Sequence, residues 1–304
     1  MVSVLAHQRA RVKVPATSAN LGPGFDVMGL CLSLYDELSV EVIDGPDEAK
    51  VIGEGEKDLP VDSNHLVIKS IRHTLNYVGA SASGLKLTSH NRIPHARGLG
   101  SSSAAIVAGI SLARELVGSD KLSKQEMIDL AGKIEGHPDN IAPCILGGAT
   151  IAWSNQQDHN AVRLNVNSEL VPIIAIPEYQ LATKQARSVL PQQVTREESV
   201  FNISRTALLV HSLTQDLSLL FQATEDRLHQ FQRSEVMPKS WHLLSELRRN
   251  EFPAVVSGAG PAILILATSE YADAVVNAVN KIDPEFKVLA LTVDQGGVQA
   301  TSEN

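Results

Sequence analysis

The stretch HARGLGSSSAA, residues 95–105, constrains the fold of this chain more than any other. Its glycines and serines predict a tight turn, and Ala104, Ala105 and Ile106 predict a helix that begins directly after the turn. Such a turn leaves backbone N–H groups without partners, and the N-terminus of the helix carries a partial positive charge. Both features favour an anion, most often phosphate. The loop therefore predicts a phosphate site in front of a helix.

Other interpretations of this loop depend on its last residues. The usual phosphate loop places a lysine after its last glycine, whereas three serines follow Gly100 here. The dinucleotide motif G-x-G-x-x-G is disfavoured, because Ser103 replaces its third glycine and the preceding strand ends several residues too early. A turn that merely caps a helix stays open as an alternative, although three serines supply more hydroxyl and N–H groups than a cap requires.

Composition excludes several classes of protein. The 304 residues are 43% hydrophobic and 20% charged, which is normal for a globular protein with a core. The formal net charge is −8, and no basic block of five or more residues occurs, which argues against a dedicated binder of nucleic acid or anionic membranes. No apolar run reaches the roughly 18 residues of a membrane helix, and the first residues lack a signal-peptide pattern. We therefore expect a cytoplasmic protein with no nucleic-acid or membrane partner.

Hydrophobic periodicity predicts an α+β chain. Strands are expected at residues 9–14, 38–43, 84–89, 149–153, 171–176, 253–258, 262–267 and 286–293. Helices are expected at residues 64–78, 104–117, 124–135, 197–222, 240–250 and 269–281. Ser63 and Ser123 are the expected caps of the first and third helices, and residues 15–29 and 136–148 are expected to be irregular. A polar stretch near residue 155 predicts a boundary between domains at 1–155 and 156–304.

Two irregular stretches carry polar side chains suited to a ligand. In PATSANLGPGFDVMG, residues 15–29, Asn20 and Asp26 are the groups expected to contact one. In EGHPDN, residues 135–140, no second histidine stands at zinc-ligand spacing, whereas the Glu135 carboxylate suits Mg²⁺. Ordinary turn chemistry explains the same residues equally simply, so both interpretations stay open at this point.

The second half of the chain adds one glycine turn and two lone arginines. The turn is SGAGPA, residues 257–262, and its glycines permit a close approach of backbone. Arg187 lies in TKQAR and Arg233 in FQR. A lone arginine is usually a solvated surface residue, so neither by itself indicates a site.

Taken together, these stretches resemble the homoserine kinase family of the GHMP superfamily, which also contains galactokinase, mevalonate kinase and phosphomevalonate kinase. PATSANLGPGFD is similar to its first motif, and RGLGSSSAA to its second, the phosphate loop. SGAGP is similar to the third, with Ala259 at a position often occupied by serine. The resemblance covers the whole chain. It implies an N-terminal domain like ribosomal protein S5 domain 2, a ferredoxin-like C-terminal α/β sandwich, and an active site between them.

The resemblance further implies that ATP, with Mg²⁺, phosphorylates the side-chain hydroxyl of L-homoserine in threonine biosynthesis. The residues implied for ATP, with Asn64 on the adenine side, are Asn64, Pro94, His95, Ala96, Arg97, Gly98, Leu99, Gly100, Ser101, Ser102 and Ser103. The implied Mg²⁺ ligands are Ser102 and Glu135. The residues implied for homoserine are Asn20, Asp26, His137, Asn140, Thr183, Arg187 and Arg233. The resemblance also allows a homodimer.

The implied pocket suits a zwitterion. The substrate carboxylate would meet the guanidinium of Arg187 or Arg233, and its ammonium would meet Asp26. No carboxylate is assigned as a general base, and Asp139 and Asn140 are kept as groups that orient the hydroxyl.

Two alternatives from other classes remain. A related kinase of shikimate or mevalonate would leave Asp26 without an ammonium partner. A nucleotide-binding regulator without catalysis would not need Glu135 and the loop serines.

Overall fold

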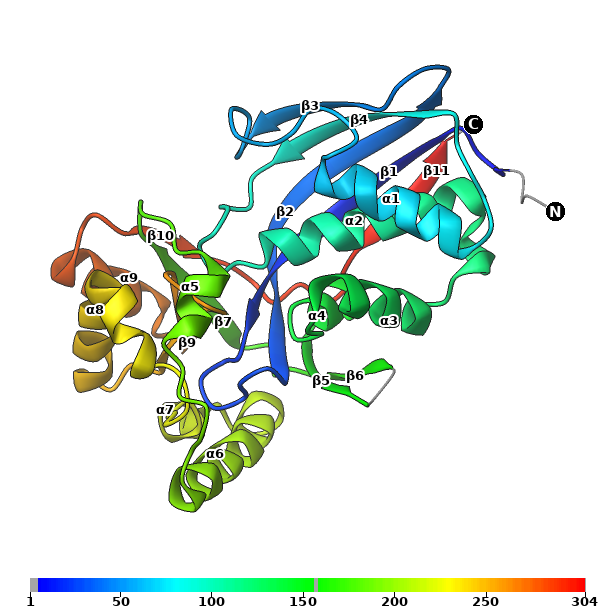
Figure 1. The fold of residues 1–304 in the computed structure, drawn as a ribbon. Helices are drawn as coiled ribbons and strands as arrows, with labels where there is room; N and C mark the ends of the chain where they lie inside the picture. Colours follow the sequence, from blue (N-terminus) through cyan, green and yellow to red (C-terminus); the bar gives the residue numbers. More distant parts are fainter. Residues whose placement is uncertain (1–4, 156–157, 304) are drawn as a thin grey trace.

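The chain folds around two β-sheets with helices packed on them, as Figure 1 shows. The structure is a computed structural model, and it describes residues 5–155 and 158–303. In these ranges one sheet has seven strands and the other has four. This arrangement confirms the predicted α+β class.

The larger sheet is built mostly from the first half of the chain. Its strands are β1 (Arg9–Ala19), β2 (Met28–Ile43), β3 (Glu48–Gly53), β4 (Gly84–Asn91), β5 (Ala149–Ser154), β6 (His159–Leu164) and β11 (Gln299–Glu303). The order is β11-β1-β2-β4-β3, with β5 paired to both β2 and β6, and only β3 and β4 run parallel.

The expectation of an irregular segment over residues 15–29 was wrong at both of its ends. β1 continues to Ala19 and β2 already begins at Met28, so only residues 20–27 form a loop. The pairing of β1 with β2 shifts register between Pro15 and Ala16. A proline is tolerated in a strand at such an irregularity. Pairing with β2 therefore makes residues 15–19 a strand although their local sequence predicts a turn.

One face of the larger sheet is covered by helices α1 (Leu66–Tyr77), α2 (Ser101–Val117), α3 (Lys124–Glu135) and α4 (Ile141–Leu146), and η1 (Ser119–Lys121) connects α2 to α3. The central helix α2 packs against α1, α3 and β1. The capping box of Ser123 and Glu126 at the start of α3 is confirmed. The expected cap at Ser63 was wrong, because His65 Nδ1 accepts from the N–H of Val67 and caps α1 instead. Helix α4 lies where an irregular segment was expected.

The smaller sheet has helices on one face and the main core on the other. Its strands are β7 (Leu170–Ile176), β8 (Ala254–Val256), β9 (Ile263–Thr268) and β10 (Lys287–Ala290), in the antiparallel order β10-β7-β9-β8. Alternate residues of β9 point to opposite faces. Ile263 and Ile265 belong to a core with α8 (Pro238–Arg249) and α9 (Ala272–Ile282), whereas Leu264 and Leu266 belong to the larger core.

Shorter elements surround this sheet: α5 (Thr183–Ser188), α6 (Arg196–Thr214), η2 (Leu217–Leu219), α7 (Leu220–Ala223) and η3 (Gln232–Val236). The helix expected over residues 197–222 ends at Thr214, so this expectation was wrong. Asp216 accepts the N–H of Ser218 and starts a new 3₁₀ turn, which interrupts the helix. In the part of the chain described here, no helix is long and apolar enough to cross a membrane.

Segments distant in sequence complete the larger sheet. The expected boundary at residue 155 falls in the β5–β6 hairpin, and residues 156–157 lie outside the described residues. The last strand, β11, returns to pair with β1. Folding units at 1–155 and 156–304 therefore stay a prediction, and the larger sheet takes β6 and β11 from beyond that division.

Candidate active site

A cavity of about 240 Å³ gathers most of the predicted site residues. The predicted residues that line it are Asn20, Ala96, Gly98, Leu99, Gly100, Ser101, Ser102, Ser103, Glu135, His137, Asp139, Asn140, Thr183, Arg187 and Arg233. Gly258 and Ala259 of the turn between β8 and β9 line it as well. The phosphate loop and the second-half arginines, about a hundred residues apart in sequence, thus share one site.

The phosphate loop needs glycine at two positions. Gly98 and Gly100 have φ of +75° and +68°, in the left-handed region that favours glycine. A Cβ on Gly98 would lie 2.1 Å from the Ser257 carbonyl oxygen, and a Cβ on Gly100 would lie 2.1 Å from Thr17 Oγ1. Helix α2 begins at Ser101 without a side-chain cap and without an acidic residue in its first turn. Its first N–H groups and its dipole therefore favour an anion in the cavity.

Glu135 stands beside this loop at the end of α3, and Gly136 closes that helix in the left-handed conformation. The hydroxyls of Ser102 and Ser103 donate to its two carboxylate oxygens at 3.0 and 3.1 Å. Mg²⁺ is commonly held by one or two protein oxygens together with phosphate oxygens and water. Across the described ranges no group of three or more His, Cys, Asp or Glu side chains could hold a metal. A carboxylate and a hydroxyl next to the phosphate loop therefore fit Mg²⁺ bound together with a nucleotide.

Residues 137–140 form a fixed polar turn on the cavity wall. His137 Nδ1 lies 2.8 Å from Asp139 Oδ1, and this hydrogen bond, opposed in part by burial, raises the pKa of His137. The N–H of Asn140 donates to the same carboxylate oxygen at 2.9 Å. Thr17 Oγ1 donates to Asn140 Oδ1 at 2.9 Å. Because its oxygen is engaged, Asn140 presents its NH₂ group as a donor to the cavity.

Asp26 and Arg187, predicted to hold opposite ends of the substrate, contact each other. Arg187 donates to the two Asp26 oxygens at 2.7 and 3.1 Å, and this hydrogen bond raises the pKa of Arg187. Asp26 has a φ of +57°, and its N–H donates to Asn20 Oδ1. Asn20 Nδ2 in turn donates to the Gly258 carbonyl oxygen at 2.7 Å. Asp26 does not line the cavity itself and reaches it through Arg187.

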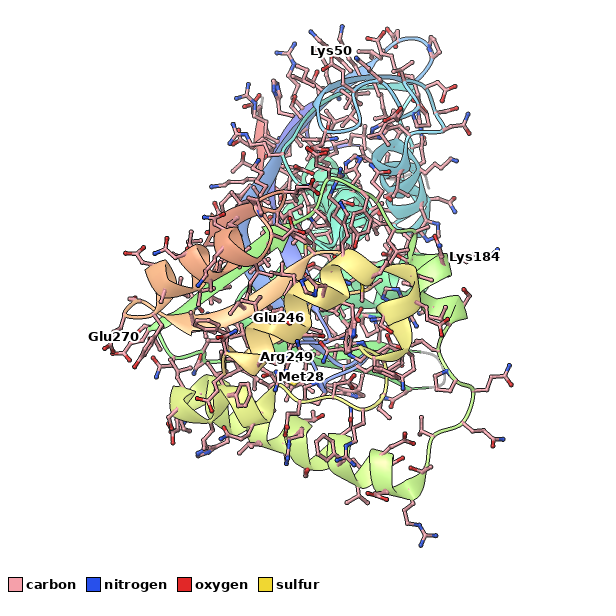
Figure 2. The ribbon with its side chains drawn as sticks, turned by 90° about the vertical axis from the view of Figure 1, so that its left-hand side faces the viewer. Met28, Lys50, Lys184, Glu246, Arg249 and Glu270 are labelled. Atoms are coloured by element: carbon pink, nitrogen blue, oxygen red, sulfur yellow. The ribbon has the colours of Figure 1, made fainter. Side chains whose placement is uncertain are left out.

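Arg233 is only 1% exposed, so the usual expectation of a solvated arginine fails here. Its Nη1 donates to the Gly258 carbonyl oxygen and to His229 Nδ1, and its Nε donates to the Ala186 carbonyl oxygen. Burial, with a smaller effect from Arg187, lowers the pKa of Arg233 to about 10. Arg187 approaches from α5, where Figure 2 shows Lys184, about one turn earlier, pointing away into solvent.

A second cavity of about 240 Å³ adjoins the phosphate loop and shares Ser101 and Ser102 with the first. Its remaining lining residues are Val14, Asp36, Leu38, Leu59, His65, Leu66, Val67, Ser89, Asn91, His95 and Ala105. A mostly apolar cavity with a few polar groups suits a nucleobase.

Three residues predicted for ATP lie outside both cavities. Asn64 is exposed and bonds to Asp62, while its neighbour His65 lines the second cavity. Pro94 is buried. Arg97 donates to the carbonyl oxygens of residues 95, 177 and 178, so it joins the phosphate loop to the segment after β7.

Residues that the sequence analysis did not single out hold the cavity-lining residues in place through hydrogen bonds. Thr17 fixes Asn140, and Ser257 Oγ lies 2.9 Å from Ser18 Oγ and donates to the Gly98 carbonyl oxygen at 2.6 Å. Thr17, Ser18 and Ser257 lie inside the quoted motifs, so those motifs were the available signal. His229, behind Arg233, lies in no motif.

The fold and this site together define a GHMP kinase. Residues 65–148 match the family model "GHMP kinases N terminal domain", and residues 206–284 match "GHMP kinases C terminal". The chain is 47% identical over 267 residues to homoserine kinase of Streptomyces coelicolor, covering 87% of this chain and 86% of that protein. It is 48% identical over 266 residues to homoserine kinase of Leifsonia xyli, covering 87% and 82%. The chain belongs to the homoserine kinase family.

Solved structures agree with this assignment. The crystal structure of homoserine kinase from Cytophaga hutchinsonii superposes with a TM-score of 0.87 at 28% identity, over 97% of this chain and 98% of that one. Mevalonate diphosphate decarboxylase from Staphylococcus aureus, at 16% identity and a TM-score of 0.73, shares the fold. The resemblance and the GHMP kinase architecture expected from the sequence are confirmed.

Proposed function

We propose that this protein transfers the γ-phosphoryl group of ATP to the side-chain hydroxyl of L-homoserine, giving O-phospho-L-homoserine for threonine biosynthesis. One observation carries the proposal: the uncapped N-terminus of α2, the carboxylate of Glu135 and the guanidinium groups of Arg187 and Arg233 meet in one cavity. A phosphate site and a carboxylate site are what a kinase of an amino-acid alcohol requires. The relatives named homoserine kinase support the same substrate.

Phosphoryl transfer depends mainly on positioning and on stabilisation of charge. The N–H groups at the start of α2 bind the phosphate oxygens, and the neighbouring cavity receives the adenine. Ser102 and Glu135 hold Mg²⁺, which neutralises phosphate charge when it is bound. A lysine in the loop is then not required.

Binding of homoserine replaces the ion pair between Asp26 and Arg187 with ion pairs to the substrate carboxylate and to the substrate ammonium. Before homoserine binds, Asp26 and Arg187 neutralise each other. The carboxylate of homoserine binds Arg187 and Arg233, which frees Asp26 from Arg187 to bind the ammonium, so every charge keeps a partner. Thr183, at the start of α5, and His137 border the same cavity and complete the substrate site.

The hydroxyl is oriented by a donor and needs no dedicated base. Thr17 fixes Asn140 so that its NH₂ group donates to the hydroxyl oxygen, while Asp139 fixes the turn through His137 and the Asn140 N–H. In a loose transition state the nucleophile needs little activation, so its proton leaves late.

A panel of alcohol acceptors tests the proposal. Coupled ADP release, with the product identified by ³¹P NMR, should show Mg²⁺-dependent turnover with L-homoserine well above that with shikimate or mevalonate. Preferred turnover of another alcohol would replace homoserine as the substrate, and ATP binding without turnover of any acceptor would favour a regulator.

Two finer expectations accompany this function. The enzyme acts in the cytoplasm on small molecules, and a homodimer is the assembly to test. Light scattering at enzyme-assay concentration measures the assembly directly, and a monomeric mass would remove the dimer.

A further inference from the structure

His229 is a fully buried histidine that lies behind Arg233. Nη1 of Arg233 donates to His229 Nδ1 at 2.8 Å. On the other side of the ring, His229 Nε2 lies 2.8 Å from the carbonyl oxygen of Gly22 in the first motif. The imidazole also stacks on Phe25, with ring centroids 5.0 Å apart and planes at 26°. His229 therefore contacts both the substrate-site arginine and the loop over residues 20–27.

These two hydrogen bonds permit one form of the ring. A guanidinium has no acceptor, so Nδ1 must carry the lone pair that receives the Arg233 N–H. A carbonyl has no donor, so Nε2 must carry the hydrogen. A proton on Nδ1 would point directly at the Arg233 donor. The neutral imidazole with hydrogen on Nε2 is the only form that makes both bonds.

Burial outweighs the charged groups around the ring and favours this neutral form. An Asp226 carboxylate oxygen lies 3.8 Å from Nε2. The two Asp226 oxygens already accept hydrogen bonds from the backbone N–H groups of residues 228, 229 and 230 and from Asn202 Nδ2. The negative charges of Asp226 and Asp26 favour the protonated ring, whereas the positive charge of Arg233 opposes it. Burial has the largest effect and lowers the pKa of His229.

Among the described residues, the contact with His229 is one of three hydrogen bonds that orient Arg233. Its Nη1 and Nε are fixed by His229, the Gly258 carbonyl oxygen and the Ala186 carbonyl oxygen. Its Nη2 makes no hydrogen bond within residues 5–155 and 158–303, and Arg233 lines the cavity. The Arg233 guanidinium carbon lies 5.6 Å from the centre of the Phe25 ring, against which His229 also packs. With Nη1 and Nε engaged in this way, Nη2 is the nitrogen of the guanidinium that remains to donate to a carboxylate.

We propose that His229 is a positioning residue, which as a neutral imidazole holds Arg233 and the Gly22 turn in place for the carboxylate of the substrate. This role rests on the proposed homoserine kinase function. It predicts that substitution of His229 weakens binding of the substrate carboxylate and leaves nucleotide binding unchanged. Within the described residues, the hydrogen bonds of the His229 ring go to Gly22 and Arg233 and not to the phosphate loop.

Three variants test this role in the full-length protein. His229→Leu removes both bonds, and His229→Gln can restore an acceptor and a donor. Leu247→Val, on the buried face of α8, controls for lost packing. For His229→Leu we expect the KM for L-homoserine to rise about 10-fold or more, the lower end of a charged hydrogen bond. Saturated kcat and the KM for ATP should stay within about 3-fold, and His229→Gln should recover part of the loss.

The substrate 3-amino-1-propanol, which is homoserine without its carboxylate, separates positioning from general damage. His229→Leu should hardly affect its kcat/KM. Equal losses in kcat/KM for homoserine and for 3-amino-1-propanol would overturn the role of His229. An equally large rise in the KM for homoserine in Leu247→Val would overturn it as well. If the wild type does not phosphorylate homoserine, the proposed function fails first and the role falls with it.

A measurement on the wild type covers the case in which His229→Leu does not fold. The ¹⁵N NMR signals of the His229 ring should report hydrogen on Nε2 alone at pH 7. A doubly protonated ring, or hydrogen on Nδ1, would contradict the proposed contact with Arg233.

Discussion

Gly100→Ala should damage catalysis far more than it damages the fold. Gly100 has a φ of +68°, where an alanine costs about 1–2 kcal/mol. The added Cβ would lie 2.1 Å from Thr17 Oγ1 and 3.1 Å from Asn140 Oδ1, two atoms that are hydrogen-bonded to each other. The substitution must therefore displace the hydroxyl that fixes the Asn140 amide.

The size of the effect follows from these contacts. Ordinary contact distances require Thr17 Oγ1 or the loop to move by about 1 Å or more. Loss of the hydrogen bond adds about 0.5–1.5 kcal/mol to the backbone strain, so the free energy of unfolding should fall by about 1.5–3.5 kcal/mol. A misplacement of about 1 Å near the reacting atoms costs on the order of 100-fold in rate, and we expect kcat to fall by that factor.

Gly79→Ala is the matched control. Gly79 has a φ of +72° beyond the end of α1, and a Cβ there would meet nothing within 4 Å. It should lose about 1–2 kcal/mol in urea unfolding and keep wild-type kcat in a coupled ADP-release assay. If Gly100→Ala retains the kcat of Gly79→Ala, the phosphate loop does not work through the Thr17–Asn140 contact.

Three further predictions test single groups. Glu135→Ala should lower kcat at least about 100-fold through loss of the Mg²⁺ site. It also removes the acceptor of the Ser102 and Ser103 hydroxyls, so the free energy of unfolding in urea should fall by about 1–3 kcal/mol; full activity in the folded variant would remove Glu135 from the metal site. His137→Asn should mainly raise the KM for homoserine, and an unchanged KM with a collapsed kcat would make His137 the base. Burial raises the pKa of Asp36 from 3.8 to about 6, so the stability that its protonated form supplies is present below pH 3.8 and lost as pH rises through about 6. The asparagine of Asp36→Asn can still accept from the N–H groups of residues 92 and 93. In urea unfolding this variant should be up to about 3 kcal/mol more stable than the wild type at pH 8, and no more stable than the wild type near pH 3.5. An equal difference in stability at both pH values would contradict the burial of the Asp36 charge.

The glycine turn over residues 98–100 and the helix after it could be predicted from the sequence because their signals are local. Glycines 98 and 100 are needed for left-handed backbone, and the alanine-rich run after them favours helix α2. The capping box at Ser123 was found for the same reason. Local signals also misled: the turn residues of 15–19 suggested a loop, but pairing with β2 makes them strand.

Features that depend on distant contacts could not be found this way. Nothing near β11 in the sequence indicates that it pairs with β1. The burial of Arg233 cannot be inferred from its neighbours in the sequence, which are those of an ordinary surface arginine. The ion pair between Asp26 and Arg187 spans 161 positions, so the residues were identified but not their mutual contact. His229 was missed because its partners come from the first motif and from η3, which only the fold brings together. Asp216 is a different case, because an aspartate two residues before a serine is a local turn signal that could have ended the predicted helix.

The most direct test of the central claim compares two acceptors in two proteins. L-homoserine and 3-amino-1-propanol differ by the carboxylate that Arg187 is proposed to bind, and Arg187→Lys keeps the charge but loses the bidentate geometry. A charged hydrogen bond contributes about 1.5–3 kcal/mol, so removal of the carboxylate should cost the wild type about 10- to 150-fold in kcat/KM. It should cost Arg187→Lys much less, with the KM for ATP nearly unchanged in both proteins. Equal losses in the two proteins would show that Arg187 does not bind the substrate carboxylate, and would contradict the assignment of this cavity to homoserine.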